Sequence, residues 1–98
     1  MANYSLTNKA VDDLSEIWEY TFETWSETQA DKYFHMLHAM FDDLANGNVE
    51  GKNYHEISKE IFGCKAGQHI IFYRKQKGRI EITRVLHNRM DLKIRIKE

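Results

Sequence analysis

The sequence predicts an α+β fold in which two helices precede a meander of antiparallel strands, in the order β-α-α-β-β-β. In the first half of the chain, large apolar residues recur every three or four positions, which is the spacing of one helical face. From residue 60 onward the period shortens, and apolar runs alternate with turns that contain glycine. With 98 residues, 42% of them hydrophobic, the chain has room for one domain, residues 1–98.

The first element is a short strand over residues 3–6, where polar and apolar residues alternate. Thr7 or Asn8 then supplies an N-cap, and apolar residues at helical spacing continue to Trp25, where we expect the first helix to end. The opposite face of this helix is acidic and includes Asp13.

A second helix follows almost without a loop. Ser26 and Gln29 have the spacing of a capping box, and Asn46-Gly47 supplies a left-handed stop. Two helices joined so closely must pack as an antiparallel hairpin, which we expect to cover one face of the sheet. Four aromatic residues at helical spacing are predicted to belong to the core: Trp18, Trp25, Tyr33 and Phe41.

Residues 48–58 are polar and predict a loop, after which three strands are expected over residues 60–65, 68–75 and 79–87. Residues 70–73 are apolar in succession, as in a central strand that is covered on both faces. The meander therefore predicts a small sheet that is mainly antiparallel.

The net charge of −1 conceals a division between the two halves of the chain. Residues 1–50 carry two basic and ten acidic residues, a net charge of −8, whereas residues 51–98 carry twelve basic and five acidic residues, a net charge of +7. The acidic half coincides with the helices, and the basic half with the sheet and a basic C-terminal tail. This asymmetry predicts two surfaces of opposite sign, and phosphate contacts by the basic half remain one interpretation beside simple solvation.

Arg84 is the most informative single residue, because it falls among apolar residues of the last strand. On simple alternation, one face of this strand carries Ile80, Ile82, Arg84 and Leu86, and the other carries Glu81, Thr83, Val85 and His87. An arginine is rarely buried without a partner. Either Arg84 forms a structural ion pair with a carboxylate such as Asp91 or Glu56, or it marks an anion or partner site at the rim of the sheet.

Polar residues also gather where the last strand ends, at His87, Asn88, Arg89 and Asp91. A histidine there could act as a general acid or base, but no nearby serine or cysteine nucleophile is evident in the sequence. His35 and His38 have helical spacing, but a lone pair is a weak metal signal, and we expect them to be exposed to solvent. No metal site or cofactor is predicted.

The single cysteine, Cys64, excludes an internal disulfide framework and fits a reducing compartment. The N-terminus is polar, and no apolar run approaches the roughly 18 residues that a membrane helix needs. We therefore expect a cytoplasmic protein without a membrane partner.

Residues 67–74 (GQHIIFYR) and 80–91 (IEITRVLHNRMD) closely resemble the ParE toxins of bacterial toxin–antitoxin modules, within the RelE/ParE superfamily. The helical half agrees in residues 13–20 (DLSEIWEY), in Trp25 and in residues 29–33 (QADKY). The segment from Arg84 to Asp91 is the most specific part of a resemblance that spans almost the whole chain.

The resemblance implies the fold derived above and the toxin component of a type II toxin–antitoxin system. It implies inhibition of DNA gyrase by binding, with contact to gyrase-bound DNA possible, and neutralisation by a ParD-like antitoxin protein. No reaction and no cofactor would then be involved. The candidate residues for the toxic or binding surface are Arg74, Arg84, His87, Arg89 and Asp91.

Two alternatives remain open. One is a RelE-like ribosome-dependent mRNA endonuclease with Arg84, His87 and Arg89 at its centre, but the basic positions of that branch are occupied here by Glu60 and Phe62, and its terminal catalytic tyrosine is missing from residues 92–98. These losses favour the ParE branch, because they remove the general acid and base. The other alternative is an inactive family member that only binds antitoxin.

Overall fold

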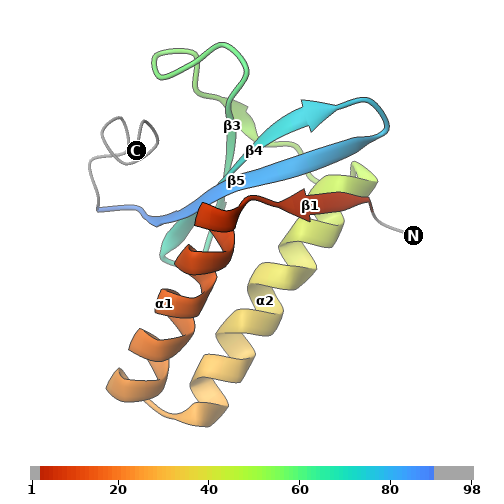
Figure 1. Cartoon of the computed structure of the whole chain (residues 1–98). Coiled ribbons are helices and arrows are strands. Elements are labelled where there is room, and N and C mark those ends of the chain that lie inside the picture. The colour runs from red at the N-terminus through yellow and green to blue at the C-terminus, as the bar shows by residue number, and fades with distance from the viewer. Residues whose placement is uncertain (1–2, 90–98) are drawn as a thin grey trace.

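The computed structural model describes residues 3–89, which form a five-stranded sheet with two helices on one face (Figure 1). The elements are β1 (Tyr4–Leu6), α1 (Asn8–Thr24), α2 (Glu27–Asn46), β2 (Lys52–Asn53), β3 (Phe62–Ala66), β4 (His69–Gln76) and β5 (Arg79–His87). The predicted α+β class and the helical hairpin are confirmed. The basic tail predicted at the C-terminus lies outside the described residues.

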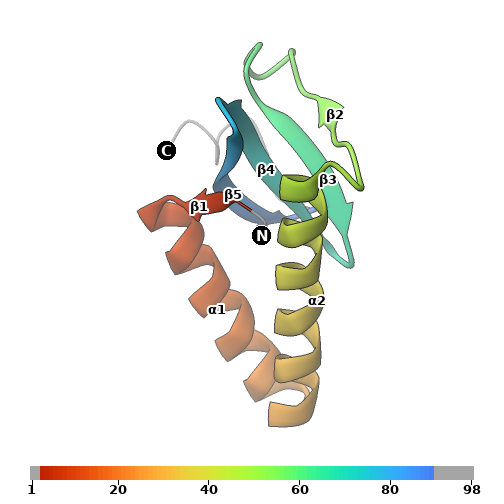
Figure 2. The same ribbon diagram turned by 90° about the vertical axis from the view of Figure 1, so that its right-hand side faces the viewer.

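The strands are arranged in the order β1-β5-β4-β3-β2, and only the β1–β5 pair among them is parallel. Figures 1 and 2 show the hairpin projecting from the sheet, so that the turn between α1 and α2 lies far from the strands. The main core forms where the sheet-proximal parts of the helices meet the sheet, around Leu14, Leu37, Phe41, Ile71 and Ile82.

The helix ends follow the expected capping chemistry. The Thr7 hydroxyl oxygen accepts from the Ala10 amide at 3.1 Å, and the Ser26 hydroxyl oxygen accepts from the Gln29 amide at 3.1 Å. Gly47 ends α2 in the left-handed conformation, with φ +77°. The C-cap of α1 is Trp25, whose amide donates to the Thr21 carbonyl, and the N-cap of α2 is the next residue, Ser26, so the hairpin turn is fixed by local sequence.

The segment expected to be a loop, residues 48–58, contains the two-residue strand β2, which pairs with Phe62 and Gly63. The next strand also begins later than expected, at Phe62 rather than at residue 60. The Tyr54 carbonyl accepts from two backbone amides of a turn, and the Tyr54 amide donates to Ile61. The bond to Ile61 extends the pairing of β2 with β3 by one position, and the pairing ends there because the turn uses the Tyr54 carbonyl.

The alternation predicted along the last strand is wrong beyond Ile82, because the β4–β5 ladder contains a bulge. Phe72 lies opposite Arg84, but Tyr73 lies opposite Ile82, so Thr83 is an extra residue on β5. A single inserted residue reverses the faces of every later side chain.

The two sides of the sheet show this reversal directly. Ile80, Ile82 and Val85 pack in the core beneath the helices, whereas Leu86 joins Phe72 in a second apolar cluster that does not include helix residues. The bulge therefore places Val85, and not Leu86, on the helix side of β5.

A tyrosine hydroxyl ties the β3–β4 turn to α2. The Tyr33 hydroxyl oxygen accepts from the Gln68 amide at 2.9 Å and lies 3.4 Å from the Ala66 carbonyl oxygen. Gly67 has a φ of +59°, and a Cβ placed on it would lie 2.7 Å from the Tyr33 hydroxyl oxygen. The turn therefore requires glycine both for its backbone and for this close approach.

This close approach predicts unequal effects of the same substitution at two turns. Gly67→Ala should lower the free energy of unfolding by about 2–4 kcal/mol, because it strains φ and displaces the Tyr33 hydroxyl. Gly78→Ala is the matched control: Gly78 has a φ of +73°, but no described atom lies within 4 Å of its Cβ position. It should cost only about 1 kcal/mol. Urea denaturation measures both, and equal losses would contradict the Tyr33 contact.

Candidate functional site

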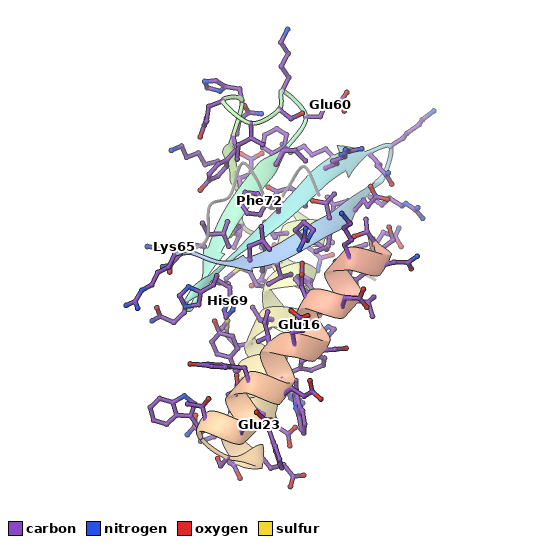
Figure 3. All side chains as sticks on the ribbon, turned by 60° about the vertical axis from the view of Figure 1, so that its left-hand side comes forward. Glu16, Glu23, Glu60, Lys65, His69 and Phe72 are labelled. Carbon is purple, nitrogen blue, oxygen red and sulfur yellow. The ribbon has the colours of Figure 1, made fainter. Side chains whose placement is uncertain are left out.

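A cleft of about 750 Å³ lies between α1, the start of α2 and the end of the sheet where β4 begins and β5 ends. Its described lining consists of Asp13, Glu16, Ile17, Tyr20, Thr21, Trp25, Gln29, Tyr33, Gln68, His69, Arg84, Val85, Leu86 and His87. Figure 3 shows His69 at this end of the sheet and Glu16 on the α1 wall. The cleft is large enough to receive several side chains of a partner.

The inner wall is fixed by an ion pair between α1 and β5. Arg84 Nε donates to Asp13 Oδ2 at 2.8 Å, and its Nη2 donates to Asp13 Oδ1 at 3.0 Å. Asp13 Oδ2 also accepts from the Val85 amide at 3.0 Å. The exposed fractions of the two side chains are 12% for Arg84 and 10% for Asp13, so the pair is largely shielded from water.

The structural ion pair expected of Arg84 is thus present, but its partner is neither of the two that were named. Glu56 is exposed in the loop before β3, and Asp91 lies outside the described residues. The actual partner, Asp13, was assigned to the acidic outer face of the first helix and is instead buried. The bulge after Ile82 changes the side of β5 from which Arg84 extends, which simple alternation could not foresee.

Two histidines from neighbouring strands meet beside this ion pair. The His69 and His87 rings are nearly perpendicular, with centroids 5.2 Å apart. His69 Nδ1 forms a hydrogen bond with the Tyr33 hydroxyl, and His87 Nδ1 accepts from the Arg89 amide at 3.1 Å. The structure thus brings His87 together with His69, a residue that the sequence did not single out.

The surroundings of His69 favour its neutral form. Burial, followed by the neighbouring His87, lowers the pKa of His69 from its ordinary value of 6.5 to about 4, and Asp13 opposes this shift. Burial also raises the pKa of Tyr33, against the opposing hydrogen bond from Gln68. At neutral pH the inner cleft therefore holds an uncharged imidazole and an uncharged phenol.

The outer part of the cleft is aromatic and open. Tyr20 is 67% exposed and Trp25 is 73% exposed, both near the projecting end of the hairpin. The prediction that Trp25 belongs to the core is therefore wrong, whereas Phe41 is fully buried as predicted. Large aromatic side chains at the mouth of an apolar cleft are typical of protein-binding sites.

The remaining predicted residues do not all lie at this cleft. Arg89 is exposed just beyond the end of β5, but Arg74 is exposed near the opposite end of β4, across from Glu81. The exposed basic residues around the β4–β5 turn, called here the basic tip, are Arg74, Lys75, Lys77 and Arg79. Because β4 extends from His69 to Gln76, the basic tip lies about 20 Å from the cleft.

Residues 3–89 contain no group of three or more histidine, cysteine or acidic side chains that could hold a metal ion. His35 is exposed as expected, but His38 is half-buried and lies 3.4 Å from the Tyr4 hydroxyl. Burial lowers the pKa of His38. In the described part of the chain, no helix is long and apolar enough to span a membrane.

A family model and two curated sequences that are similar to this chain all describe the same class of protein. Residues 4–92 match the family model for the ParE toxin of the type II toxin–antitoxin system parDE. The chain is 36% identical over 92 residues to Toxin ParE1 of Mycobacterium tuberculosis (strain H37Rv), covering 93% of this chain and 94% of the relative. It is 34% identical over 91 residues to Toxin ParE1 of Caulobacter vibrioides, covering 93% and 94%.

The fold is also similar to a solved structure described as the chromosomal ParDE TA system from P. aeruginosa. The TM-score is 0.76 at 16% sequence identity, and the match covers 89% of this chain and 96% of the solved one.

The ion pair predicts that removing the charge of one carboxylate strongly lowers the free energy of unfolding. Asp13→Asn should lower the free energy of unfolding by about 3–5 kcal/mol, because it leaves the largely buried Arg84 charge without its carboxylate. Asp12→Asn, at the exposed neighbouring position, should change it by less than about 0.5 kcal/mol. Chemical denaturation measures both variants, and a loss below about 1 kcal/mol for Asp13→Asn would contradict this role.

The shifted histidine predicts a pH dependence of stability. The pKa of His69 is lower in the folded chain than its ordinary value, so the unfolded chain binds more protons between about pH 6.5 and 4. The contribution of neutral His69 is thus fully present above pH 6.5 and is lost as the pH falls toward 4. His69→Gln should make the free energy of unfolding less dependent on pH in this window. Identical pH profiles for the two proteins would contradict the assignment.

Proposed function

The chain belongs to the ParE family of toxins of type II toxin–antitoxin systems, and from this premise we propose that it acts in the cytoplasm by binding and inhibiting DNA gyrase. We propose further that a ParD-like antitoxin neutralises it by docking in the cleft. The observation that carries the docking proposal is the exposure of Tyr20 and Trp25 over an apolar cleft of about 750 Å³.

An amphipathic helix suits this cleft. Its apolar side chains, spaced three or four residues apart, could pack between the aromatic mouth and the end of β5 at Val85. Tyr20 and Trp25 would then lose much of their exposed surface, which is the usual source of binding energy at a protein interface.

A second contact could form at the edge of the sheet. Strand β2 pairs with Phe62 and Gly63, so among residues 3–89 the segment Cys64–Ala66 of β3 has a strand neighbour on one side only. On the opposite edge, the backbone of β5 beyond β1 is already engaged: the Thr7 hydroxyl donates to the Thr83 carbonyl, and Asp13 accepts from the Val85 amide. An added strand of the antitoxin therefore fits the β3 edge better than the β5 edge.

The toxic surface in this proposal combines the end of β5 with the basic tip. His87 lines the cleft, and the Arg89 amide donates to its ring, so a docked antitoxin would cover His87 and lie beside Arg89, which gives neutralisation a direct physical basis. The basic tip supplies exposed positive charge for acidic protein surface or gyrase-bound DNA.

Binding is favoured over RNA cleavage by two contacts. The Arg84 guanidinium, which a nuclease would use on a phosphate, is held by Asp13 through two hydrogen bonds. Phe62 stacks on Tyr73 with ring centroids 5.7 Å apart, and the Lys75 ammonium lies 4.6 Å from the Phe62 ring centre. The Phe62 position is therefore used for packing.

The direct test is a supercoiling assay with purified gyrase. The chain should inhibit supercoiling, and the antitoxin from the adjacent reading frame should restore it. Unaffected supercoiling together with cleavage of translated mRNA would instead establish the RelE-like alternative. Unaffected supercoiling without mRNA cleavage, but with tight antitoxin binding, would establish an inactive family member.

The aromatic mouth predicts a specific loss of antitoxin affinity. Trp25→Ala should weaken antitoxin binding about 10- to 100-fold, because it removes a large exposed anchor, with little change in the free energy of unfolding. Phe22→Ala is the matched control, since Phe22 is 45% exposed but does not line the cleft. Calorimetric titration measures both affinities, and equal losses would place the antitoxin elsewhere.

A further inference from the structure

The inner end of the cleft presents two imidazoles whose hydrogen bonds define their proton positions. His87 Nδ1 accepts the Arg89 amide proton, so neutral His87 carries its own proton on Nε2. The Tyr33 hydroxyl already accepts from the Gln68 amide and has one proton to donate. The Tyr33 hydroxyl has two acceptors within reach, His69 Nδ1 and the Ala66 carbonyl oxygen at 3.4 Å, and His69 Nδ1 is the nearer of the two. We therefore assign the Nε2–H tautomer to neutral His69, because the phenol proton then goes to its nearer acceptor.

The two Nε2–H groups belong to rings whose centroids are only 5.2 Å apart, and both rings line the cleft. A single group with two acceptor oxygens could accept a hydrogen bond from each of these N–H groups. Gly67 and Tyr33 hold the turn that carries His69 against α2, so this arrangement is set before any partner binds.

The hydrogen-bonding groups of the pair favour an oxygen acceptor, while the charges around the pair nearly cancel. From β5 and the residues after it, Arg84 and Arg89 contribute positive charge; from α1, Asp13 and Glu16 contribute negative charge; and from α2, Tyr33 is neutral. Asp13 is neutralised by Arg84 in the ion pair described above. Glu16 and Arg89 are both exposed, where water screens their charges. A cation would meet two N–H donors and gain no acceptor from either ring.

We propose that the antitoxin segment seated in the cleft places one carboxylate against His69 and His87, where it accepts a hydrogen bond from Nε2 of each ring. This inference rests on the proposed docking of the antitoxin in the cleft and specifies the chemistry of its inner contact. The partner segment is then an amphipathic helix with apolar anchors for Tyr20 and Trp25 and one acidic residue at its sheet-facing end.

A carboxylate at this position makes binding depend on pH with a definite sign. A negative charge beside the two imidazoles stabilises their protonated forms, so the complex binds more protons than the separate proteins. Affinity must then rise as the pH falls. A neutral carbonyl group at the same place would accept the same hydrogen bonds but would cause little proton uptake.

The test is calorimetric titration of the full chain with the antitoxin from the adjacent reading frame, between pH 7.5 and 5.5. Titrations in two buffers of different ionisation enthalpy measure the protons taken up directly. Wild-type protein should take up a substantial fraction of one proton near pH 6, and its affinity should rise roughly tenfold across the range. This measurement needs no variant and so does not depend on the folding of one.

Variants then locate the protons. His69→Gln and His87→Gln should each reduce the proton uptake and flatten the affinity profile, whereas His35→Gln, at an exposed position outside the cleft, should leave both unchanged. Tight binding by the wild type without proton uptake or pH dependence would overturn the carboxylate contact and leave the proposed function standing. Absence of antitoxin binding would overturn both.

Discussion

The ion pair between Asp13 and Arg84 is the interaction on which the arrangement of the candidate site depends. It joins positions 71 residues apart, one on the first helix and one on the last strand. The same carboxylate also accepts from the Val85 amide, so it fixes backbone as well as side chain. The cleft has α1 as one wall and the end of β5 as its floor, and this pair sets the distance between them. Removing one partner would leave a largely buried charge, which is among the costly defects in a small core.

The pair also controls the edge of the sheet. β1 covers β5 only at residues 80–82, and beyond it Thr7 and Asp13 take the backbone groups of Thr83 and Val85. An exposed row of unpaired backbone groups would invite association with other strands. The fold thus closes one edge with side chains and leaves Cys64–Ala66 of β3 as the better edge for a partner. The ion pair at the inner wall of the cleft and the closed edge of the sheet depend on the same carboxylate, that of Asp13.

Most of the fold could be predicted from the sequence, because its signals are local. The caps at Thr7, Ser26 and Gly47 and the apolar spacing of the helices are all readable within a few residues. The β4–β5 hairpin was equally clear. The features that were missed are non-local: β2 is too short to have a period and exists because β3 offers it a partner, and the bulge at Thr83 has no signature in the alternation of β5.

The same distinction applies to the site. Arg84 was recognised as a buried cation that needed a partner, but the identity of that partner depended on the bulge and on the packing of α1 against β5. His87 was noticed because it ends a strand, whereas His69 acquires its role only from the register that sets it opposite His87. Trp25 has the spacing of a core residue, but the end of the hairpin projects beyond the sheet (Figure 2). The sheet therefore does not bury Trp25, which stays largely exposed.

In the proposed complex, the antitoxin occupies the cleft held by the Asp13–Arg84 pair. Amide hydrogen exchange of the full chain, alone and with the antitoxin, tests this claim most directly. On complex formation, protection should appear in residues 16–29, which form the α1 wall and the turn of the hairpin. It should also appear around the two histidines, in residues 66–69 and 84–89. The basic tip, residues 74–79, should exchange as it does in the free chain. Protection confined to the basic tip and the loop at residues 54–61, with the cleft unchanged, would contradict the account.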